Sequence, residues 1–147
     1  EMGEQWAITV LCGVSCRSHQ KHFNQSHQES GIIIAALEAL GRHGERGDKQ
    51  IMDCVASRLQ DVQPHVRRAA WKTCSTVAVK GDESVIVAVV NCLNSGLSIK
   101  IAALSNLHAL VDKGDDRIIS AVSRCIEDRN EKLALPAARS LSAIVDK

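Results

Sequence analysis

Apolar residues recur along this chain with two periods. Within short stretches they fall at helical spacing, as at Val66, Ala70, Cys74 and Val77, because residues three or four apart share one face of a helix. Over longer distances the same pattern returns about every 34 residues. A fixed period of this length predicts a repeat array whose units bury their apolar faces against one another. The equivalent first positions, with spacings of 34, 33 and 34 residues, are Ile32, Val66, Ile99 and Leu133.

Each repeat is predicted to contain two helices separated by a Gly-Asp turn. Glycine suits the left-handed conformation that ends a helix, and aspartate can cap the next helix by accepting backbone N–H bonds. In the first repeat we expect helices from about Ile32 to Arg42 and from Lys49 to Gln60. Val55, Val89 and Val122 are equivalent in the second helices and are expected to point into the core. The predicted turns are Gly47-Asp48, Gly81-Asp82 and Gly114-Asp115.

The expected fold class is all-α: a right-handed α-solenoid of antiparallel helix pairs with about three and a half repeats. Residues 1–30 do not fit the pattern and are expected to be irregular. Within them, Gln5 to Val14 is either a short capping helix or strand or a displaced piece of a preceding repeat, and Ser18 to Ser30 is a polar linker. The repeat domain covers 31–147 and is divided into 31–65, 66–98, 99–132 and a half repeat, 133–147.

The half repeat ends before any second helix. Leu135-Pro136 is expected to place proline in its first helical turn, where the missing N–H costs no intrahelical bond. Its apolar face lacks the second helix that would cover it, so we expect a longer array or a partner to meet this open end. The face consists of Leu133, Ala137, Leu141, Ile144 and Val145.

The stretches VRRAAWKT and IKIAALSNL, with a Gly-Asp turn before the second helix, resemble HEAT-like repeats of the short, bilin-lyase type. The resemblance covers about Gly31 to Lys147, although HEAT units usually run to about 40–47 residues. The W-x2-L-G-x2-Y pattern of tetratricopeptide repeats and the T-P-L-H of ankyrin repeats are absent. The resemblance implies that the second helices line a concave surface. It also implies two enzymatic alternatives, a bilin lyase and a metal-dependent hydroxylase, but the His-Glu dipeptides of such hydroxylases are absent.

Composition narrows the choice of partner and compartment. With 18 basic and 17 acidic residues, the chain has no overall attraction to nucleic acid or to an anionic membrane. Aromatic content is 2%, so the core must be aliphatic. Of six cysteines, four occupy helical core positions (Cys54, Cys74, Cys92 and Cys125), which favours reduced cysteines. We therefore expect an intracellular, cytoplasmic protein without a membrane span.

Two clusters carry a chemical alternative. Cys12, Cys16, His19 and His22, followed by His27, offer zinc-binding side chains, but their spacing matches no established structural site, and no metal or cofactor is predicted. Basic residues on the first helices could track phosphates, although aromatic residues for stacking are scarce and a solvated face explains them equally well. These residues are Arg67, Arg68, Lys72, Lys100 and Arg139.

The leading hypothesis is a non-catalytic scaffold or adaptor that binds a peptide or another protein along the second helices. No catalytic residues are predicted, and a HEAT-like enzyme or a nucleic-acid-binding repeat is the alternative. Residues three or four apart on the outer face of these helices share one surface. The predicted partner-binding surface consists of Gln50, Asp53, Ser57, Ser84, Val87, Asn91, Arg117, Ser120 and Arg124.

Overall fold

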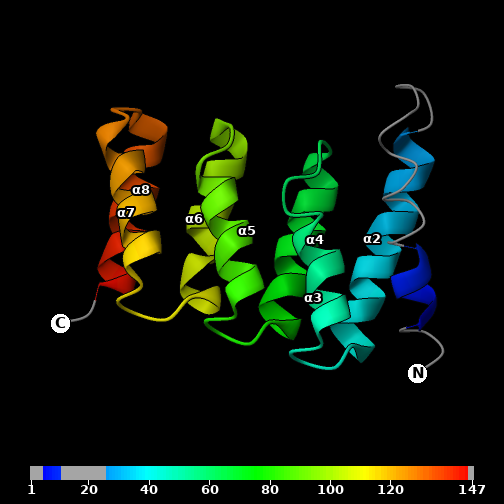
Figure 1. Cartoon of the computed structure of the whole chain (residues 1–147). Helices are drawn as coiled ribbons and strands as arrows, with labels where there is room; N and C mark the ends of the chain where they lie inside the picture. The colour runs from blue at the N-terminus through cyan, green and yellow to red at the C-terminus, as the bar shows by residue number, and fades with distance from the viewer. Residues whose placement is uncertain (1–4, 11–25, 146–147) are drawn as a thin grey trace. The chain divides into compact units, whose positions relative to one another are not determined.

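The computed structural model describes residues 5–10 and 26–145. These residues form helices joined by short loops, with no strand in either range, so the all-α class is confirmed (Figure 1). A short helical stretch covers residues 5–10. No helix in the described part of the chain combines the length and apolar character needed to cross a bilayer. The remaining helices are α2 (Ser26–His43), α3 (Lys49–Ala56), α4 (Pro64–Val77), α5 (Glu83–Leu93), α6 (Leu97–Leu110), α7 (Asp116–Glu127) and α8 (Glu131–Ile144).

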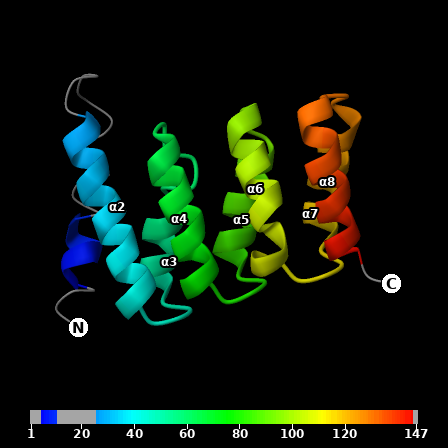
Figure 2. The same ribbon diagram turned by 180° about the vertical axis from the view of Figure 1, so that it is seen from behind.

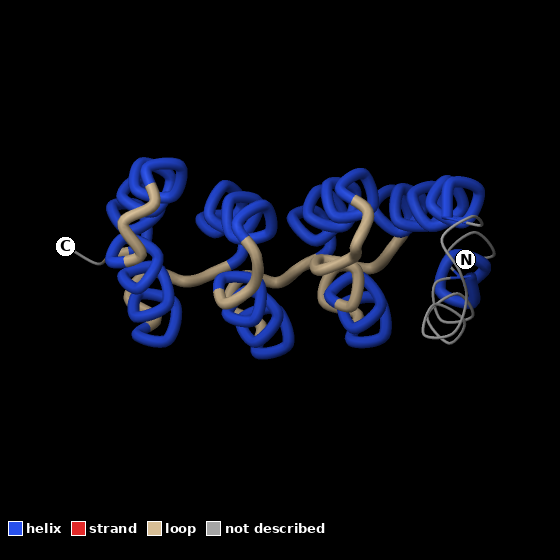
Figure 3. Tube along the Cα trace, turned by 90° about the horizontal axis from the view of Figure 1, so that it is seen from above, coloured by secondary structure: helices blue, strands red, loops and turns tan. Residues whose placement is uncertain are grey.

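The chain forms two compact units, Glu1–Val77 and Ala78–Lys147, here called the N-terminal and C-terminal units. In the N-terminal unit α4 packs against both α2 and α3, and residues 5–10 lie beside α2 (Figures 1 and 2). In the C-terminal unit α5 packs beside α7 and α6 beside α8, while α5 contacts α6 and α7 contacts α8. Seen from above, α5 and α7 form one layer of this unit and α6 and α8 the other (Figure 3).

The three predicted Gly-Asp turns share one backbone geometry. Their glycines have φ of 85°, 84° and 83°, the left-handed region in which a side chain is disfavoured, so this prediction is confirmed. Each glycine also donates its N–H to a carbonyl at or next to the end of a later helix, where such oxygens lack intrahelical partners. The bonds run from Gly47 to Val77 (2.8 Å), from Gly81 to Leu110 (3.0 Å) and from Gly114 to Ile144 (2.7 Å).

The aspartate of each turn caps the helix that follows it, as the sequence predicts. Asp48 accepts the N–H of Ile51 at 3.0 Å at the start of α3. Asp82 accepts that of Ser84 at 2.9 Å at the start of α5. At the start of α7, Asp115 accepts the N–H of Arg117 at 3.0 Å. Each carboxylate satisfies a donor that the first helical turn leaves unpaired.

The inward face of the second helices is also as predicted. Val55, Val89 and Val122 have no exposed surface, and all four helical cysteines are buried. In the first repeat the predicted first core position is wrong, because Ile32 is 46% exposed whereas Ile33 is buried. The buried face of α2 is set by Ile33, Ala36, Leu37 and Leu40, which follow one another at helical spacing.

Two helix ends differ from their predicted positions. The polar linker was expected to reach Ser30, but α2 already begins at Ser26, with Glu29 in its first turn where a negative charge favours the helix. The α3 helix ends at Ala56 instead of Gln60. There the Ser57 hydroxyl donates to the Cys54 carbonyl at 2.7 Å, a local side-chain bond that competes with the helical ladder.

Pro136 does not lie in the first turn of its helix, which corrects the prediction. Asn130 caps α8 by accepting the N–H of Lys132 at 3.0 Å. The helix therefore begins at Glu131, and Pro136 lies inside it. A proline at this position removes one intrahelical hydrogen bond, which the packing of α8 on α6 and α7 has to offset.

The apolar face of α8 is covered, contrary to the expected open end. Leu133, Ala137 and Ile144 are at most 2% exposed, because α8 packs against both α6 and α7. Leu141 is half-buried and Val145 is 42% exposed. The prediction was wrong because it assumed that this face needs a following helix, whereas the two preceding helices bury most of it.

Candidate partner-binding groove

The nine predicted surface residues divide between the two units. Gln50, Asp53 and Ser57 are exposed at α3 and its C-cap, in the N-terminal unit. The other six lie on α5 and α7 in the C-terminal unit. All of these are exposed except Ser84, which is half-buried close to the Asp82 cap.

Five of the six residues on α5 and α7 line one groove of about 290 Å³ between these two helices. We call it the α5–α7 groove. Its formation follows from the spacing on each helix, because residues three, four and seven apart project from one face. The lining residues are Ile86, Val87, Val90 and Asn91 from α5, and Arg117, Ser120 and Arg124 from α7.

Ile86 and Val90 also line this groove, although they were not predicted from the sequence. Their place on the outer face was hard to recognise from the sequence, because α5 (ESVIVAVVNCL) is apolar on nearly every side. Val85 and Val89 are fully buried in the core, so the remaining apolar residues have to lie elsewhere on the helix. An excess of apolar residues beyond one face was the available signal, since a surface helix usually needs only one such stripe.

The apolar floor of the groove is partly accessible. Ile86 is only 3% exposed and Val90 is half-buried, whereas Val87 is 49% exposed. A single exposed valine is ordinary on a protein surface. Here it borders a concavity with two other aliphatic side chains, so a ligand group placed there would remove apolar surface from water.

Arg117, at one end of the groove, is held by acidic neighbours. Its guanidinium donates to Glu83 at 2.7 Å and to Asp115 at 3.2 Å. The hydrogen bond to Glu83, followed by that to Asp115, raises the pKa of Arg117. Burial acts to raise the pKa of the Asp115 carboxyl, but hydrogen bonds from Arg117 and from backbone N–H groups outweigh it and leave this pKa below its ordinary value. The charge of Arg117 is therefore already compensated within the C-terminal unit.

Arg124 lies on the same wall of the groove, about two helical turns further along α7. Its side chain is exposed. Among the described residues, its guanidinium has no hydrogen-bond acceptor and no ion-pair partner. The groove thus offers one arginine that is already paired and one that is available to a ligand.

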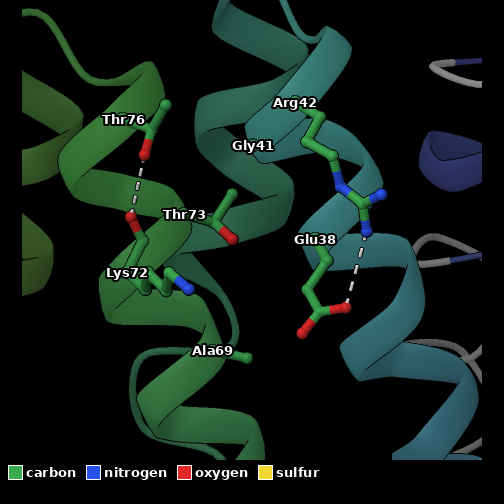
Figure 4. Close-up of a pocket in the computed structure, with 7 residues that line it drawn as sticks. All are labelled: Glu38, Gly41, Arg42, Ala69, Lys72, Thr73 and Thr76. Carbon is green, nitrogen blue, oxygen red and sulfur yellow. Dashed lines mark hydrogen bonds and ion pairs between the residues drawn. The ribbon is translucent and has the colours of Figure 1, made fainter.

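Two further grooves lie between first helices. One, between α2 and α4, has a volume of about 400 Å³ and is lined by Glu38, Gly41, Arg42, Ala69, Lys72, Thr73 and Thr76 (Figure 4). The other, between α6 and α8, has a volume of about 330 Å³ and is lined by Leu104, Ser105, His108, Pro136, Arg139, Ser140 and Ala143.

Several polar groups in these first-helix grooves form bonds within the protein. At the base of the first, the Thr73 hydroxyl donates to the Leu37 carbonyl at 2.9 Å. In the second, the Ser140 hydroxyl lies 2.7 Å from the Leu104 carbonyl. Arg42 pairs with Glu38 at 3.7 Å, as Figure 4 shows. Although the α2–α4 groove is larger than the α5–α7 groove, it lacks an aliphatic floor.

The basic residues of the first helices are partly used within the protein. Arg67 donates to the carbonyl of Asp61 at 2.8 Å, so it fixes the loop before its own helix. Lys100 lies 3.3 Å from the Asp128 carboxylate. Arg68, Lys72 and Arg139 are exposed. Two of the five predicted cations therefore have acceptors inside the chain, which weakens the case for a phosphate-binding stripe.

The candidate zinc ligands Cys12, Cys16, His19 and His22 lie outside the described residues, and His27 lies in α2 without a described side chain. Within the described residues, no group of three or more His, Cys, Asp or Glu side chains is arranged to hold a metal ion. Comparison of the chain with protein-family models, with curated proteins and with solved structures gives no match.

Proposed function

We propose that this chain is a non-catalytic interaction module that binds a peptide or another protein through the α5–α7 groove. The observation that carries the proposal is the meeting of five predicted surface residues in one concavity. These are Val87, Asn91, Arg117, Ser120 and Arg124. An accessible aliphatic floor with a few polar groups around it is the usual composition of a recognition site.

We further propose that the helices belong to a HEAT-like α-solenoid, as the resemblance implies. Support comes from the recurrence of one turn near a 34-residue period: a left-handed glycine, a capping aspartate and a bond from the glycine N–H to a later helix end. In such arrays neighbouring units bury each other's apolar faces, and extended surfaces serve for binding.

The chemistry of the groove favours binding over catalysis. General acid–base catalysis requires a group whose pKa lies near the working pH. The groove is lined by aliphatic residues, Asn91, Ser120 and two arginines, and arginine stays protonated in proteins. The described residues that line it include no histidine or carboxylate that could act as a base for Ser120. A HEAT-like lyase or hydroxylase therefore gains no support from this groove.

A displayed library of random peptides tests the proposed function. Peptides selected on the parent protein are measured against Val87→Gln and Val79→Gln, with circular dichroism to confirm that each variant is folded. Val79 is a matched control, because it is 48% exposed against 49% for Val87 and lies in the same unit but not in the groove. We expect Val87→Gln to weaken binding at least several-fold and Val79→Gln to leave it unchanged. Failure to select any peptide, or equal binding to both variants, would contradict the proposal.

A further inference from the structure

We infer that the α5–α7 groove recognises an acidic peptide, with one aliphatic side chain seated over Val87 and Val90 and a nearby carboxylate paired with Arg124. This inference rests on the proposed function and adds the chemical class of the partner. Two independent features of the groove carry it: the shape and polarity of the floor, and the uneven pairing of the two arginines.

The size and apolar character of the groove floor favour a small apolar side chain of the partner. A volume of about 290 Å³ lies just below the range of about 300–1,000 Å³ for ligand pockets, so the groove has room for one or two side chains. Val87 and the half-buried Val90 supply the accessible aliphatic surface, because Ile86 is only 3% exposed. Among the described residues, no aromatic side chain lines the groove. An aliphatic side chain of the partner fits this floor, and its burial would supply the non-directional part of the affinity.

The charged residues that line the groove favour a negatively charged group on the partner. Of the described residues, two arginines and no carboxylate line the groove. Arg117 is engaged by Glu83 and Asp115, whereas the guanidinium of Arg124 has no acidic partner among the described residues. Guanidinium matches a carboxylate in a planar, two-bond geometry. The carboxylate of the partner is therefore expected at the Arg124 end of the groove and not at the Arg117 end.

The residues between the two arginines complete the match to a peptide. Ser120 lies on α7 between Arg117 and Arg124, and Asn91 lines the same groove from α5. A hydroxyl and an amide can each donate and accept hydrogen bonds, as a peptide backbone requires. A phosphate of a nucleic acid could also pair with Arg124, but it would leave the aliphatic floor unused. Bases are usually held by aromatic stacking, for which the groove offers no partner.

The test uses peptides selected from the random library, synthesised with a fluorescent label and measured by fluorescence anisotropy. We expect the selected sequences to combine an aliphatic residue with an Asp or Glu a few positions away. Replacing that acid by its amide should weaken binding to the parent about tenfold or more, the usual size for a hydrogen bond to a charged group. Arg124→Gln should cause the same loss, and Arg124→Lys should restore part of it.

Arg139→Gln is the matched control, because it removes the same charge from an exposed position on α8 outside the α5–α7 groove. It should bind the acidic peptide like the parent. The acid-to-amide peptide should lose little further affinity on Arg124→Gln, since a double-mutant cycle reports the pairwise interaction. Thermal melts of the three arginine variants check that folding is intact.

The outcomes separate this inference from the proposed function. Peptides that depend on Val87 but contain no acid, or that bind Arg124→Gln as well as the parent, would overturn the acidic-peptide inference and leave the interaction module standing. Peptides that bind Val87→Gln as well as the parent would contradict both the proposed function and the acidic-peptide inference. A labelled single-stranded oligothymidine that binds through Arg124 while acidic peptides do not would also overturn the inference.

Discussion

The α3 helix of the N-terminal unit and the α5 and α7 helices of the C-terminal unit differ at one equivalent position. Seven residues after the first apolar position of each helix stand Arg58, Cys92 and Cys125. All three are buried, with exposures of 6%, 0% and 2%. In α5 and α7 the helix continues through this position, whereas α3 ends two residues before it.

The difference shows how a charge is accommodated at a core position. Arg58 pairs with Asp61 at 3.1 Å, and both side chains are at most 11% exposed. Asp61 is also fixed from two sides, because it accepts the N–H of Gln63 at 2.9 Å and its carbonyl accepts Arg67. A cysteine needs no such partner. The N-terminal unit therefore has a shorter helix and a charged loop where the C-terminal unit has ordinary helical packing.

The largest effect is expected where a buried charge has no partner. Val89→Asp places a carboxylate in the core of the C-terminal unit, without the counter-ion that Arg58 has in the other unit. Because burying an unpaired charge is among the most destabilising changes, we expect a loss of about 4 kcal/mol or more in the free energy of unfolding. Chemical denaturation followed by circular dichroism measures it.

Asn91→Asp is the control for this substitution, since it introduces the same carboxylate two residues away at an exposed position of α5. Its unfolding should match that of the parent to within about 0.5 kcal/mol. Equal melting of the parent and both variants would show that the assigned inward face of α5 is wrong.

A smaller effect is expected from separating the ion pair of the N-terminal unit. Asp61→Asn leaves the Arg58 charge buried without its carboxylate and should destabilise the protein by about 3 kcal/mol. Arg58→Met, which makes this position apolar as in α5 and α7, should be nearly neutral or stabilising. The emission of Trp71, which is 2% exposed in the same unit, follows the transition in a Trp6→Phe background.

The opposite ranking of these two variants would mean that Arg58 stabilises the unit by its packing and further bonds, and not merely tolerates burial. An apolar residue would then not be equivalent to the Arg58–Asp61 ion pair at this position. A double variant, Arg58→Met with Asp61→Asn, separates the two readings, because it removes both charges together.

The smallest effects come from two glycines, one in each unit, that should respond with opposite signs. Gly81 has φ +84°, and an added Cβ would collide with the Asp112 carboxylate. Gly81→Ala should therefore destabilise the protein by about 1–2 kcal/mol. Gly31 lies within α2 with open space around it, so Gly31→Ala should stabilise by about 0.5–1 kcal/mol. Thermal unfolding of both variants tests the signs, and a gain in stability for Gly81→Ala would contradict the role of that turn.

The sequence predicted those parts of the fold that depend on short-range chemistry. The left-handed glycines, the capping aspartates and the inward valines each follow from a few neighbouring residues, and the structure confirms them. The outer face of α5 and α7 was predicted in the same way, because helical spacing fixes which residues share a face. Five of its six residues accordingly lie in one groove.

The wrong predictions concern features that are determined by tertiary packing or by side-chain hydrogen bonds. The buried position in α2 shifts from Ile32 to Ile33, because in a run of three isoleucines more than one rotation of the helix buries aliphatic residues at helical spacing. The early end of α3 depends on the bond from Ser57 and the pairing of Arg58. Pro136 and the covered face of α8 depend on two helices that pack against it, which a periodic pattern does not reveal.

The bonds from the turn glycines give each of three helix ends its own spectroscopic probe. Amide hydrogens exchange with solvent only when their bonds open, and glycine amides are readily distinguished by heteronuclear resonance spectroscopy. Exchange at Gly47 would follow the end of α4, exchange at Gly81 the end of α6, and exchange at Gly114 the end of α8. Three backbone signals are thus enough to follow how firmly these helix ends are anchored, without any substitution or attached fluorophore.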